Sequence, residues 1–129
     1  MSYTQLIQKA REAMTFSYSP YSNFKVGAAL LTESGKIFTG CNVEIASFGA
    51  TNCAERTAIF KAISEGEMAF KAIAVVSSSG DYTFPCGICR QVIVEFGKDI
   101  DIIVANDYDY EVYKIDALLP KSFTQIDLK

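Results

Sequence analysis

Apolar positions in the first third of the chain follow a helical spacing and then a strand-like one. Through residues 2–17 they recur at i, i+3 and i+4, which predicts an amphipathic helix. Residues 24–32 (FKVGAALLT) form a nearly continuous apolar run, as expected of a strand covered on both faces. After the turn sequence ESGK, residues 37–44 (IFTGCNVE) return as a second strand. This part is predicted to fold as a helix followed by a β-hairpin.

The rest of the chain alternates helical patterns with strand patterns. Residues 53–65 are predicted as a helix that Thr51 or Asn52 caps and that Gly66 ends. The later elements are expected at 71–77 (strand), 86–97 (helix), 101–107 and 110–115 (strands) and 116–120 (short helix). Because one helix precedes the strand at 71–77 and another separates it from the strand at 101–107, crossover connections with helices on both faces of a sheet are expected. Residues 1–129 are predicted to form a single α/β domain.

Composition and charge narrow the choice of location and partner. No apolar stretch approaches the roughly 20 residues that a membrane helix needs, and the N-terminal sequence MSYTQLIQKAREAM carries charges where a signal peptide would be apolar. A cytoplasmic protein is therefore expected. The net charge is −3 and the 12 Lys and Arg residues are scattered, so no basic stripe for nucleic acid phosphates is visible. A small or uncharged ligand is expected, with no nucleic acid or membrane partner.

The chain contains no histidine, which excludes Ser-His-Asp triads, Cys-His dyads and zinc sites built on histidine. Any metal site must use Cys, Asp or Glu. The four cysteines are Cys41, Cys53, Cys86 and Cys89, and in a reducing cytosol they are expected to remain thiols. Alternation along the strand turns Cys41 away from Asn42, so Cys41 is interpreted as a small buried residue.

Three of these cysteines are placed for metal binding. Cys86 and Cys89 are at i and i+3 in a helix's first turn, where the helix dipole favours thiolates. Cys53 begins the other predicted helix. If both helices follow strands that end at one edge of the sheet, their N-termini converge and three sulfurs can bind Zn²⁺. Three protein ligands leave a fourth position for water, which is the pattern of catalytic zinc sites.

Two charged residues complete this pattern within one helical turn. Glu55, two residues after Cys53, can lean toward a water in the open position, where a proton carrier is needed. Arg56 is at i+3 from Cys53 and so on its face of the helix, where it can offset the excess negative charge of three thiolates.

The motif Cys86-Gly87-Ile88-Cys89 by itself leaves other interpretations open. It is also typical of a thiol-disulfide oxidoreductase and of a structural zinc site in a binding module. The redox interpretation leaves Cys53, Glu55 and Arg56 without a purpose. The combined spacing, with Cys-x-Glu in one segment and Pro-Cys-x-x-Cys in another, is instead typical of zinc deaminases that act on nucleobases.

Five stretches together resemble the small homotetrameric cytidine deaminases: YSNFKVGAALL, GCNVE, NCAERTAIFKA, PCGICRQVI and LLPKSF. The resemblance covers almost the whole chain. It implies a three-layer α/β/α fold with a five-stranded mixed sheet. It also implies hydrolytic deamination of free cytidine and deoxycytidine to uridine and deoxyuridine, with release of ammonia, in pyrimidine salvage. A related substrate remains an alternative, namely a nucleotide, an aminonucleoside antibiotic or an RNA base.

The same resemblance implies roles for individual residues. Zinc would be bound by Cys53, Cys86 and Cys89, and Glu55 would move protons from water to pyrimidine N3 and then to the departing ammonia. Substrate contacts are implied for Phe24 on the base, Asn42 and Glu44 on the ribose, Ala54, and Phe123, which would enter a neighbouring subunit's pocket. Without the resemblance, Phe24 would be interpreted as a core aromatic residue and Phe123 as packing the tail onto its own chain.

One part of this assignment can be checked from spacing. If the hairpin pairs Thr32 with Lys36, positions whose numbers sum to 68 face each other, and Phe24 meets Glu44. The base and sugar contacts would then lie side by side. The sequence departs from many relatives at Ile45, where they have Asn, and at Phe48, where they have Tyr. Hydrogen bonds from those two side chains are therefore not available.

Overall fold

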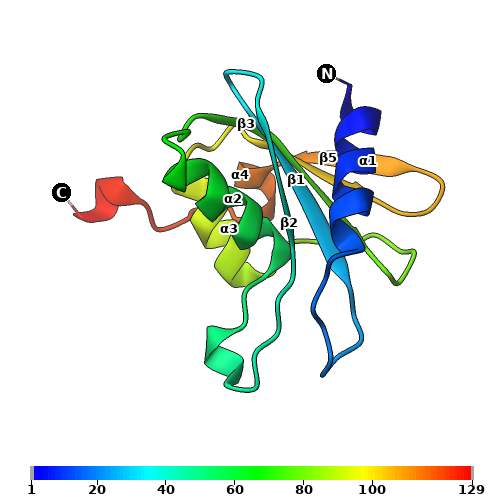
Figure 1. Ribbon diagram of the computed structural model, residues 1–129. Helices are drawn as coiled ribbons and strands as arrows, with labels where there is room; N and C mark the ends of the chain where they lie inside the picture. The colour runs from blue at the N-terminus through cyan, green and yellow to red at the C-terminus, as the bar shows by residue number, and fades with distance from the viewer. Residues whose placement is uncertain (1, 129) are drawn as a thin grey trace.

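A mixed five-stranded sheet forms the centre of the computed structural model, which describes residues 2–128 (Figure 1). Its strand order is β2-β1-β3-β4-β5, in which β3 and β4 are parallel and the other neighbours are antiparallel. The strands are β1 (Val26–Thr32), β2 (Ile37–Cys41), β3 (Phe70–Ser77), β4 (Asp101–Ala105) and β5 (Tyr110–Lys114). The α-helices are α1 (Tyr3–Met14), α2 (Ala54–Ser64), α3 (Gly87–Val94) and α4 (Ile115–Leu118), and short 3-10 turns cover Phe48–Ala50 and Gln125–Leu128.

The first helix, α1, begins at a capping box and presents one apolar face to the sheet. The Ser2 hydroxyl accepts a hydrogen bond from Gln5 N, while the Gln5 side chain accepts one from Ser2 N. The predicted helix is confirmed, although it ends at Met14. Among residues 2–128, no helix combines the length and apolar character needed to cross a membrane.

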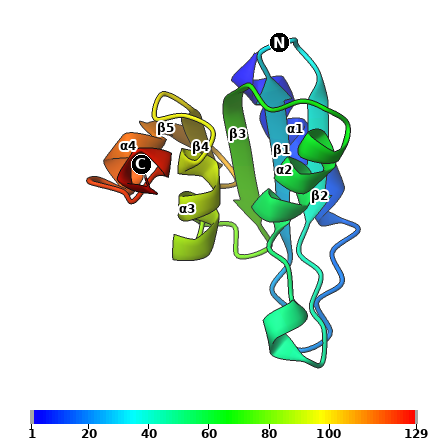
Figure 2. The same ribbon diagram turned by 90° about the vertical axis from the view of Figure 1, so that its left-hand side faces the viewer.

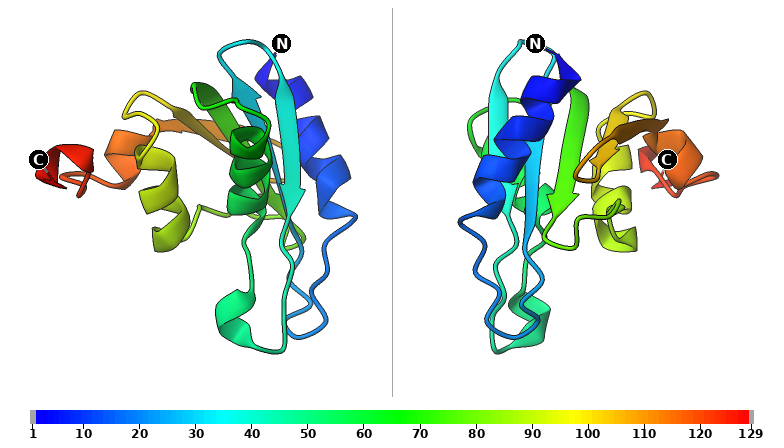
Figure 3. Two further views of the ribbon diagram at one scale, coloured as in Figure 1. Left: turned by 60° about the vertical axis from the view of Figure 1, so that its left-hand side comes forward. Right: turned by 90° about the vertical axis from the view of Figure 1, so that its right-hand side faces the viewer.

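The sheet separates two apolar layers, so the predicted three-layer α/β/α arrangement is confirmed. Strand β1 is buried on both faces. Its residues Ala28 and Leu30 pack with α2 and α3 on one face, and Ala29 and Leu31 pack with α1 on the other. Figures 2 and 3 show α1 and α2 on opposite sides of the sheet. The alternation of contacts explains why the sequence of β1 is apolar at nearly every position.

Two glycines let the helices approach the sheet closely. A Cβ atom at Gly27 would lie 2.0 Å from the carbonyl oxygen of Ala10 in α1, and one at Gly40 would lie 2.4 Å from that of Ala54 in α2. No real side chain fits at such distances. Gly40 thus determines how near the first turn of α2 lies to strand β2.

The hairpin register agrees with the prediction that facing positions sum to 68, since Gly27 faces Cys41 and Leu31 faces Ile37. The register does not extend to the predicted pair of Phe24 and Glu44, because β2 ends at Cys41. Val43 instead forms bridges with Tyr18 and Asn52, and Glu44 N donates to the carbonyl oxygen of Tyr18. The two loops that follow α1 and β2 therefore extend side by side from one end of the sheet (Figure 3).

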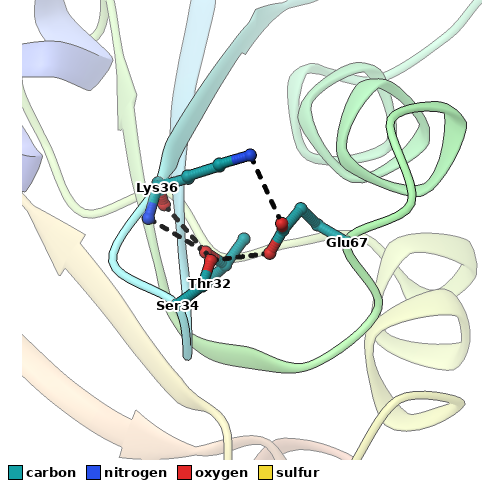
Figure 4. Close-up of polar contacts among 4 residues, drawn as sticks. All are labelled: Thr32, Ser34, Lys36 and Glu67. Carbon is teal, nitrogen blue, oxygen red and sulfur yellow. Dashed lines mark hydrogen bonds and ion pairs between the residues drawn. The ribbon is translucent and has the colours of Figure 1, made fainter.

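The opposite end of β1 is held by a polar cluster around the hairpin turn (Figure 4). Ser34 Oγ donates a hydrogen bond of 2.7 Å to Glu67 Oε1, and Lys36 Nζ lies 3.6 Å from Glu67 Oε2. The Thr32 hydroxyl also accepts a hydrogen bond from Lys36 N. These contacts join the β1–β2 turn to the loop between α2 and β3. They lie far along β1 from the residues that precede it.

Candidate metal centre and active site

The N-termini of α2 and α3 each begin with a cysteine. Cys53 is the N-cap residue of α2 and Cys86 that of α3, and neither side chain makes a capping hydrogen bond. The prediction that Thr51 or Asn52 caps α2 is therefore wrong. Thr51 Oγ1 instead accepts a hydrogen bond from Ile45 N, and Asn52 Nδ2 donates one to Thr57 Oγ1. Both sulfurs remain available for another partner.

The sulfur atoms of Cys53, Cys86 and Cys89 lie within 4.8 Å of one another. The Cys53 and Cys86 sulfurs are 3.7 Å apart, although 33 positions separate the two residues. Cys89 is fully buried, Cys53 is half-buried and Cys86 is exposed. A set of three thiols this close is a donor set that suits Zn²⁺. The convergence predicted from the two helix starts is present.

The fourth cysteine, Cys41, lies apart from this cluster. Cys41 is partly exposed rather than buried as expected, and it borders a separate cavity at the β2 edge of the sheet, together with Thr57 and Lys61 of α2. Burial raises the pKa of the Cys41 thiol. As expected from strand alternation, Cys41 points away from the metal centre.

Arg56 supplies positive charge directly to the cluster. Its Nη2 atom donates a hydrogen bond of 3.3 Å to Cys53 Sγ. A hydrogen bond with Cys89, and then the contact with Arg56, lower the pKa of Cys53 to about 5. The pKa of Cys89 is raised, because its hydrogen bond to the Cys53 sulfur and its burial both favour the neutral thiol. The Cys53 thiol therefore ionises more readily than the Cys89 thiol.

Glu55 is the buried acid beside the cluster. Its side chain is only 4% exposed, and burial raises its pKa to about 7. Such a carboxyl group changes protonation near neutral pH, as a proton carrier in catalysis requires. The burial of Glu55 is not evident from the sequence, where it stands at an ordinary position in the first turn of α2.

A pocket of about 250 Å³ opens in front of Cys53, Cys86 and Glu55. Its other lining residues are Phe24, Val26, Asn42, Glu44, Thr51, Asn52, Ala54, Thr83 and Phe84. The predicted substrate contacts Phe24, Asn42, Glu44 and Ala54 are therefore brought together with the predicted proton carrier. Cys89 and Arg56 lie behind this wall, beside Cys53.

Phe84 and Thr83 are pocket residues that the sequence patterns did not single out. Phe84 is 39% exposed and packs edge-to-face on Tyr113, with ring centroids 5.5 Å apart. The Thr83 hydroxyl lies 2.6 Å from the Ser77 hydroxyl at the end of β3. One feature of the sequence could have predicted that they line the pocket. They stand just before Pro85 and Cys86, and residues adjacent to a metal ligand must lie near the metal.

Asn42 and Glu44 both form hydrogen bonds with other residues of the chain. Asn42 Nδ2 donates to the carbonyl oxygen of Phe24 at 2.8 Å, and Asn42 Oδ1 accepts from Val26 N at 2.9 Å and from the Ser17 hydroxyl. Hydrogen bonds from Ser22 lower the pKa of Glu44, so it is ionised. The pocket wall near Phe24 is therefore fixed by polar side chains.

Phe123 does not line the pocket of its own chain. Its side chain is 58% exposed, and its carbonyl oxygen accepts a hydrogen bond of 2.7 Å from Gln91 Nε2. Of the two positions that depart from the relatives, Ile45 is 40% exposed and Phe48 packs edge-to-face on Tyr21. None of these three side chains reaches the metal centre within one chain.

Comparison with known proteins identifies the family. Residues 1–105 match the family model for the cytidine and deoxycytidylate deaminase zinc-binding region. The chain belongs to this family. Cytidine deaminase from Sporosarcina psychrophila is 46% identical over 130 residues, covering 99% of this chain and 96% of the relative. Cytidine deaminase from Halalkalibacterium halodurans is 45% identical, covering 99% and 98%.

A solved structure from the same deaminase family confirms the fold. The cytidine deaminase structure from Burkholderia pseudomallei superposes with a TM-score of 0.91 at 49% identity, and the match covers 95% of this chain and 100% of that one. A more distant relative, blasticidin-S deaminase from Bacillus cereus, is 30% identical and covers 94% of this chain. In this zinc-binding deaminase family, the cluster of Cys53, Cys86 and Cys89 is the group that could hold the metal ion.

Proposed function

We propose that the protein is a zinc-dependent hydrolase that converts free cytidine and deoxycytidine to uridine and deoxyuridine and releases ammonia. One observation carries this proposal: Cys53, Cys86 and the buried Glu55 border the same pocket, and the Cys89 sulfur lies within 4.8 Å of the other two sulfurs. The names of the relatives with 45% identity or more support it. The reaction belongs to pyrimidine salvage, and we place it in the cytoplasm, where thiols such as these stay reduced.

Proton transfer by Glu55 is the main catalytic role of the chain's own residues. Cys53, Cys86 and Cys89 would hold zinc, which would supply the Lewis acidity that lowers the pKa of water. Glu55 accepts a proton from the attacking water at a side-chain oxygen and passes it to N3 of the pyrimidine, while the water oxygen bonds to C4. It then carries the proton of the new C4 hydroxyl to the amino group, so that the C4–N bond breaks and ammonia leaves. The pKa of Glu55, raised to about 7, suits both directions of transfer. Arg56 offsets the charge of the thiolates.

Asn42 and Glu44 can recognise the substrate through the donor and acceptor positions that they do not use within the chain. Asn42 uses one of its two Nδ2 hydrogens on Phe24, so one donor remains. Glu44 accepts three hydrogen bonds from residues 21 and 22, so of about four acceptor positions on a carboxylate one remains. One donor and one acceptor suit a sugar hydroxyl. The ring of Phe24 stacks on the base.

The charge of Glu44 favours nucleosides over nucleotides. An ionised carboxylate at the sugar end of the pocket repels a phosphate, and no Lys or Arg side chain lines the pocket among the described residues. Free cytidine is therefore the preferred substrate over its monophosphate. Binding of an RNA substrate would weaken steeply as the salt concentration rises, whereas binding of an uncharged nucleoside would not.

We further propose a homotetramer with active sites near the subunit interfaces. The exposed face between α2 and α3 is apolar, with Phe60, Ile88, Val92 and Phe96 along one groove. The segment after α4 extends away from the sheet (Figure 1), and it carries the exposed Phe123. In the assembly, Phe123 enters the pocket of a neighbouring subunit. Such burial would remove an apolar side chain from water.

Subunit mixing tests this role of Phe123. The Glu55→Gln variant keeps Phe123 but lacks the proton carrier, whereas Phe123→Ala keeps Glu55. If Phe123 acts in the neighbour's pocket, the two impaired variants regain activity when they are unfolded and refolded together. Activity equal to the sum of the separate variants would reject the proposal. Sedimentation of the wild-type protein gives the subunit number directly.

The activity itself is tested by following the ultraviolet absorbance of cytidine, deoxycytidine, their monophosphates and blasticidin S. We expect turnover of the two nucleosides, with zinc present at one ion per chain. Glu55→Gln should reduce turnover by at least about a hundredfold, since general acid-base catalysis contributes about 10²–10⁴-fold. The matched control is Glu67→Gln, at the far end of the hairpin. Unchanged turnover in Glu55→Gln, or disulfide reductase activity without bound zinc, would contradict the proposal.

A further inference from the structure

Ser22 lies between the residues proposed for the sugar and for the base. Its hydroxyl donates a hydrogen bond to Glu44 Oε2 and accepts one of 3.0 Å from Phe24 N. A single hydroxyl group thus bridges a side chain at the sugar end of the pocket and the backbone of the proposed stacking residue. Among the described residues, no hydrogen bond joins Glu44 directly to Phe24.

Glu44 depends on the same loop for its orientation. Its Oε1 atom accepts hydrogen bonds from Tyr21 N at 3.0 Å and Ser22 N at 3.1 Å. These two bonds hold one oxygen, and the Ser22 hydroxyl holds the other. A carboxylate fixed at both oxygens presents its remaining acceptor position in one direction. Without the hydroxyl, Oε2 would be free to bind water or to rotate with the side chain.

Phe24 is held by side chains rather than by the sheet. Strand β1 begins only at Val26, so the sheet ladder does not fix the peptide groups of Phe24. Its N–H donates to the Ser22 hydroxyl, and its carbonyl oxygen accepts from Asn42 Nδ2 at 2.8 Å. Asn23, between Ser22 and Phe24, has a φ of 57°, a left-handed conformation that Asn tolerates. This turn brings the hydroxyl of Ser22 back to Phe24 N.

We propose that Ser22 is a positioning residue for nucleoside binding, which couples the orientation of Glu44 to the placement of the Phe24 ring. The inference rests on the proposed function, because it assigns the sugar to Glu44 and the base to Phe24. Ser22 does not touch the reacting atoms in this scheme. Its loss therefore weakens binding of the nucleoside and leaves the proton transfer at Glu55 intact.

The test compares Ser22→Ala with two variants that separate positioning from general loop stability. Ser22→Thr keeps the hydroxyl, and Ser22→Cys keeps the shape but weakens the hydrogen bonds. The matched control is Ser34→Ala, which removes the same kind of serine-to-glutamate hydrogen bond at the opposite end of β1 (Figure 4). For each zinc-loaded variant, kcat and KM for cytidine, the inhibition constant of uridine and the zinc content are measured.

We expect Ser22→Ala to raise both KM and the uridine inhibition constant about tenfold, in the range for loss of a hydrogen bond to a charged group. Its kcat and zinc content should change little. Ser22→Cys should follow Ser22→Ala, while Ser22→Thr and Ser34→Ala should resemble wild type. Wild-type KM and inhibition constant in Ser22→Ala and Ser22→Cys, or a loss confined to kcat, would overturn the inference. Absence of cytidine turnover in the wild-type protein would instead reject the proposed function.

Discussion

The guanidinium group of Arg56 and the thiol of Cys53 lie one helical turn apart, and Arg56 Nη2 donates a hydrogen bond of 3.3 Å to Cys53 Sγ. The contact raises the pKa of Arg56 and helps to lower that of Cys53 to about 5. Three thiolates around a divalent ion carry one excess negative charge, which this guanidinium offsets. The start of α2 thus provides both a ligand and its counter-charge.

Replacing Arg56 by Gln should weaken zinc binding. The contact with Cys53 would lose its positive charge, so the thiolate would form less readily. Changes to residues that support a metal ligand typically lower metal affinity about 10–100-fold. Competition with a chromogenic chelator measures this affinity. Arg11→Gln is the control, because Arg11 Nη2 donates instead to the carbonyl oxygen of Asn106 on the other side of the sheet. Equal zinc affinities for the two variants would contradict the assignment.

Replacing Glu55 by Gln should stabilise the metal-free protein at alkaline pH. Burial raises the pKa of Glu55 from 4.5 to about 7, so the folded chain keeps a proton that the unfolded chain releases. The stability that this proton contributes is present below pH 4.5 and is lost as pH rises through 7. Gln never ionises, so the variant should gain on the order of 3 kcal/mol at pH 8 and little at pH 4.

Urea denaturation of the metal-free proteins at both pH values measures that difference. Glu67→Gln is the control, because hydrogen bonding with Ser34 lowers the pKa of Glu67 rather than raising it. It should show no such gain at pH 8. A Glu55→Gln variant that is less stable than wild type at pH 8 would mean that the carboxylate has a partner in the folded chain.

Tyr3 should make unfolding sensitive to strongly alkaline pH. Burial, and then the hydrogen bond to Asp101, raise its pKa from 10.0 to about 12. The neutral phenol therefore stabilises the folded chain below pH 10, and this contribution is lost as pH rises through 12. The advantage of wild type over Tyr3→Phe in urea unfolding should shrink between these two values. A constant difference across this range would contradict the prediction.

Replacing Gly40 by Ala should disturb the metal centre through the backbone. The added Cβ would lie 2.4 Å from the carbonyl oxygen of Ala54, so the first turn of α2 must move away from β2. Overpacking of this kind costs about 1–3 kcal/mol or more, and the movement shifts Cys53 relative to Cys86. Thermal unfolding and zinc content measure the two effects. Gly49→Ala is the control, because a Cβ there meets no atom within 4 Å among the described residues.

The main elements could be predicted because their apolar spacing is a local property. The hairpin register followed from the turn at residues 33–36, and its sum of 68 holds from Gly27 to Leu31. The ends of elements were less predictable. The second predicted helix begins with Cys53 as its cap rather than Thr51 or Asn52, since the polar side chains of those two residues bond within the preceding loop and to Thr57.

Three features of the site could be read from the order of the residues alone: the spacing of Cys86 and Cys89, the placement of Glu55 and Arg56 within one turn of Cys53, and the absence of histidine. These features depend only on helix geometry and composition. The proximity of Cys53 and Cys86 across 33 positions comes from the fold, because it depends on strand order and on the packing of two helices.

Tertiary structure also decided the chemistry of the neighbouring groups. The raised pKa of Glu55 depends on the fold, because burial is its largest cause and the nearby charge of Cys53 adds to it. The bridge from Ser22 to Glu44 exists only because two loops from different parts of the chain fold against each other at one end of the sheet. Local spacing determines which side chains share one face of a helix, whereas desolvation and contacts between distant segments depend on the whole fold.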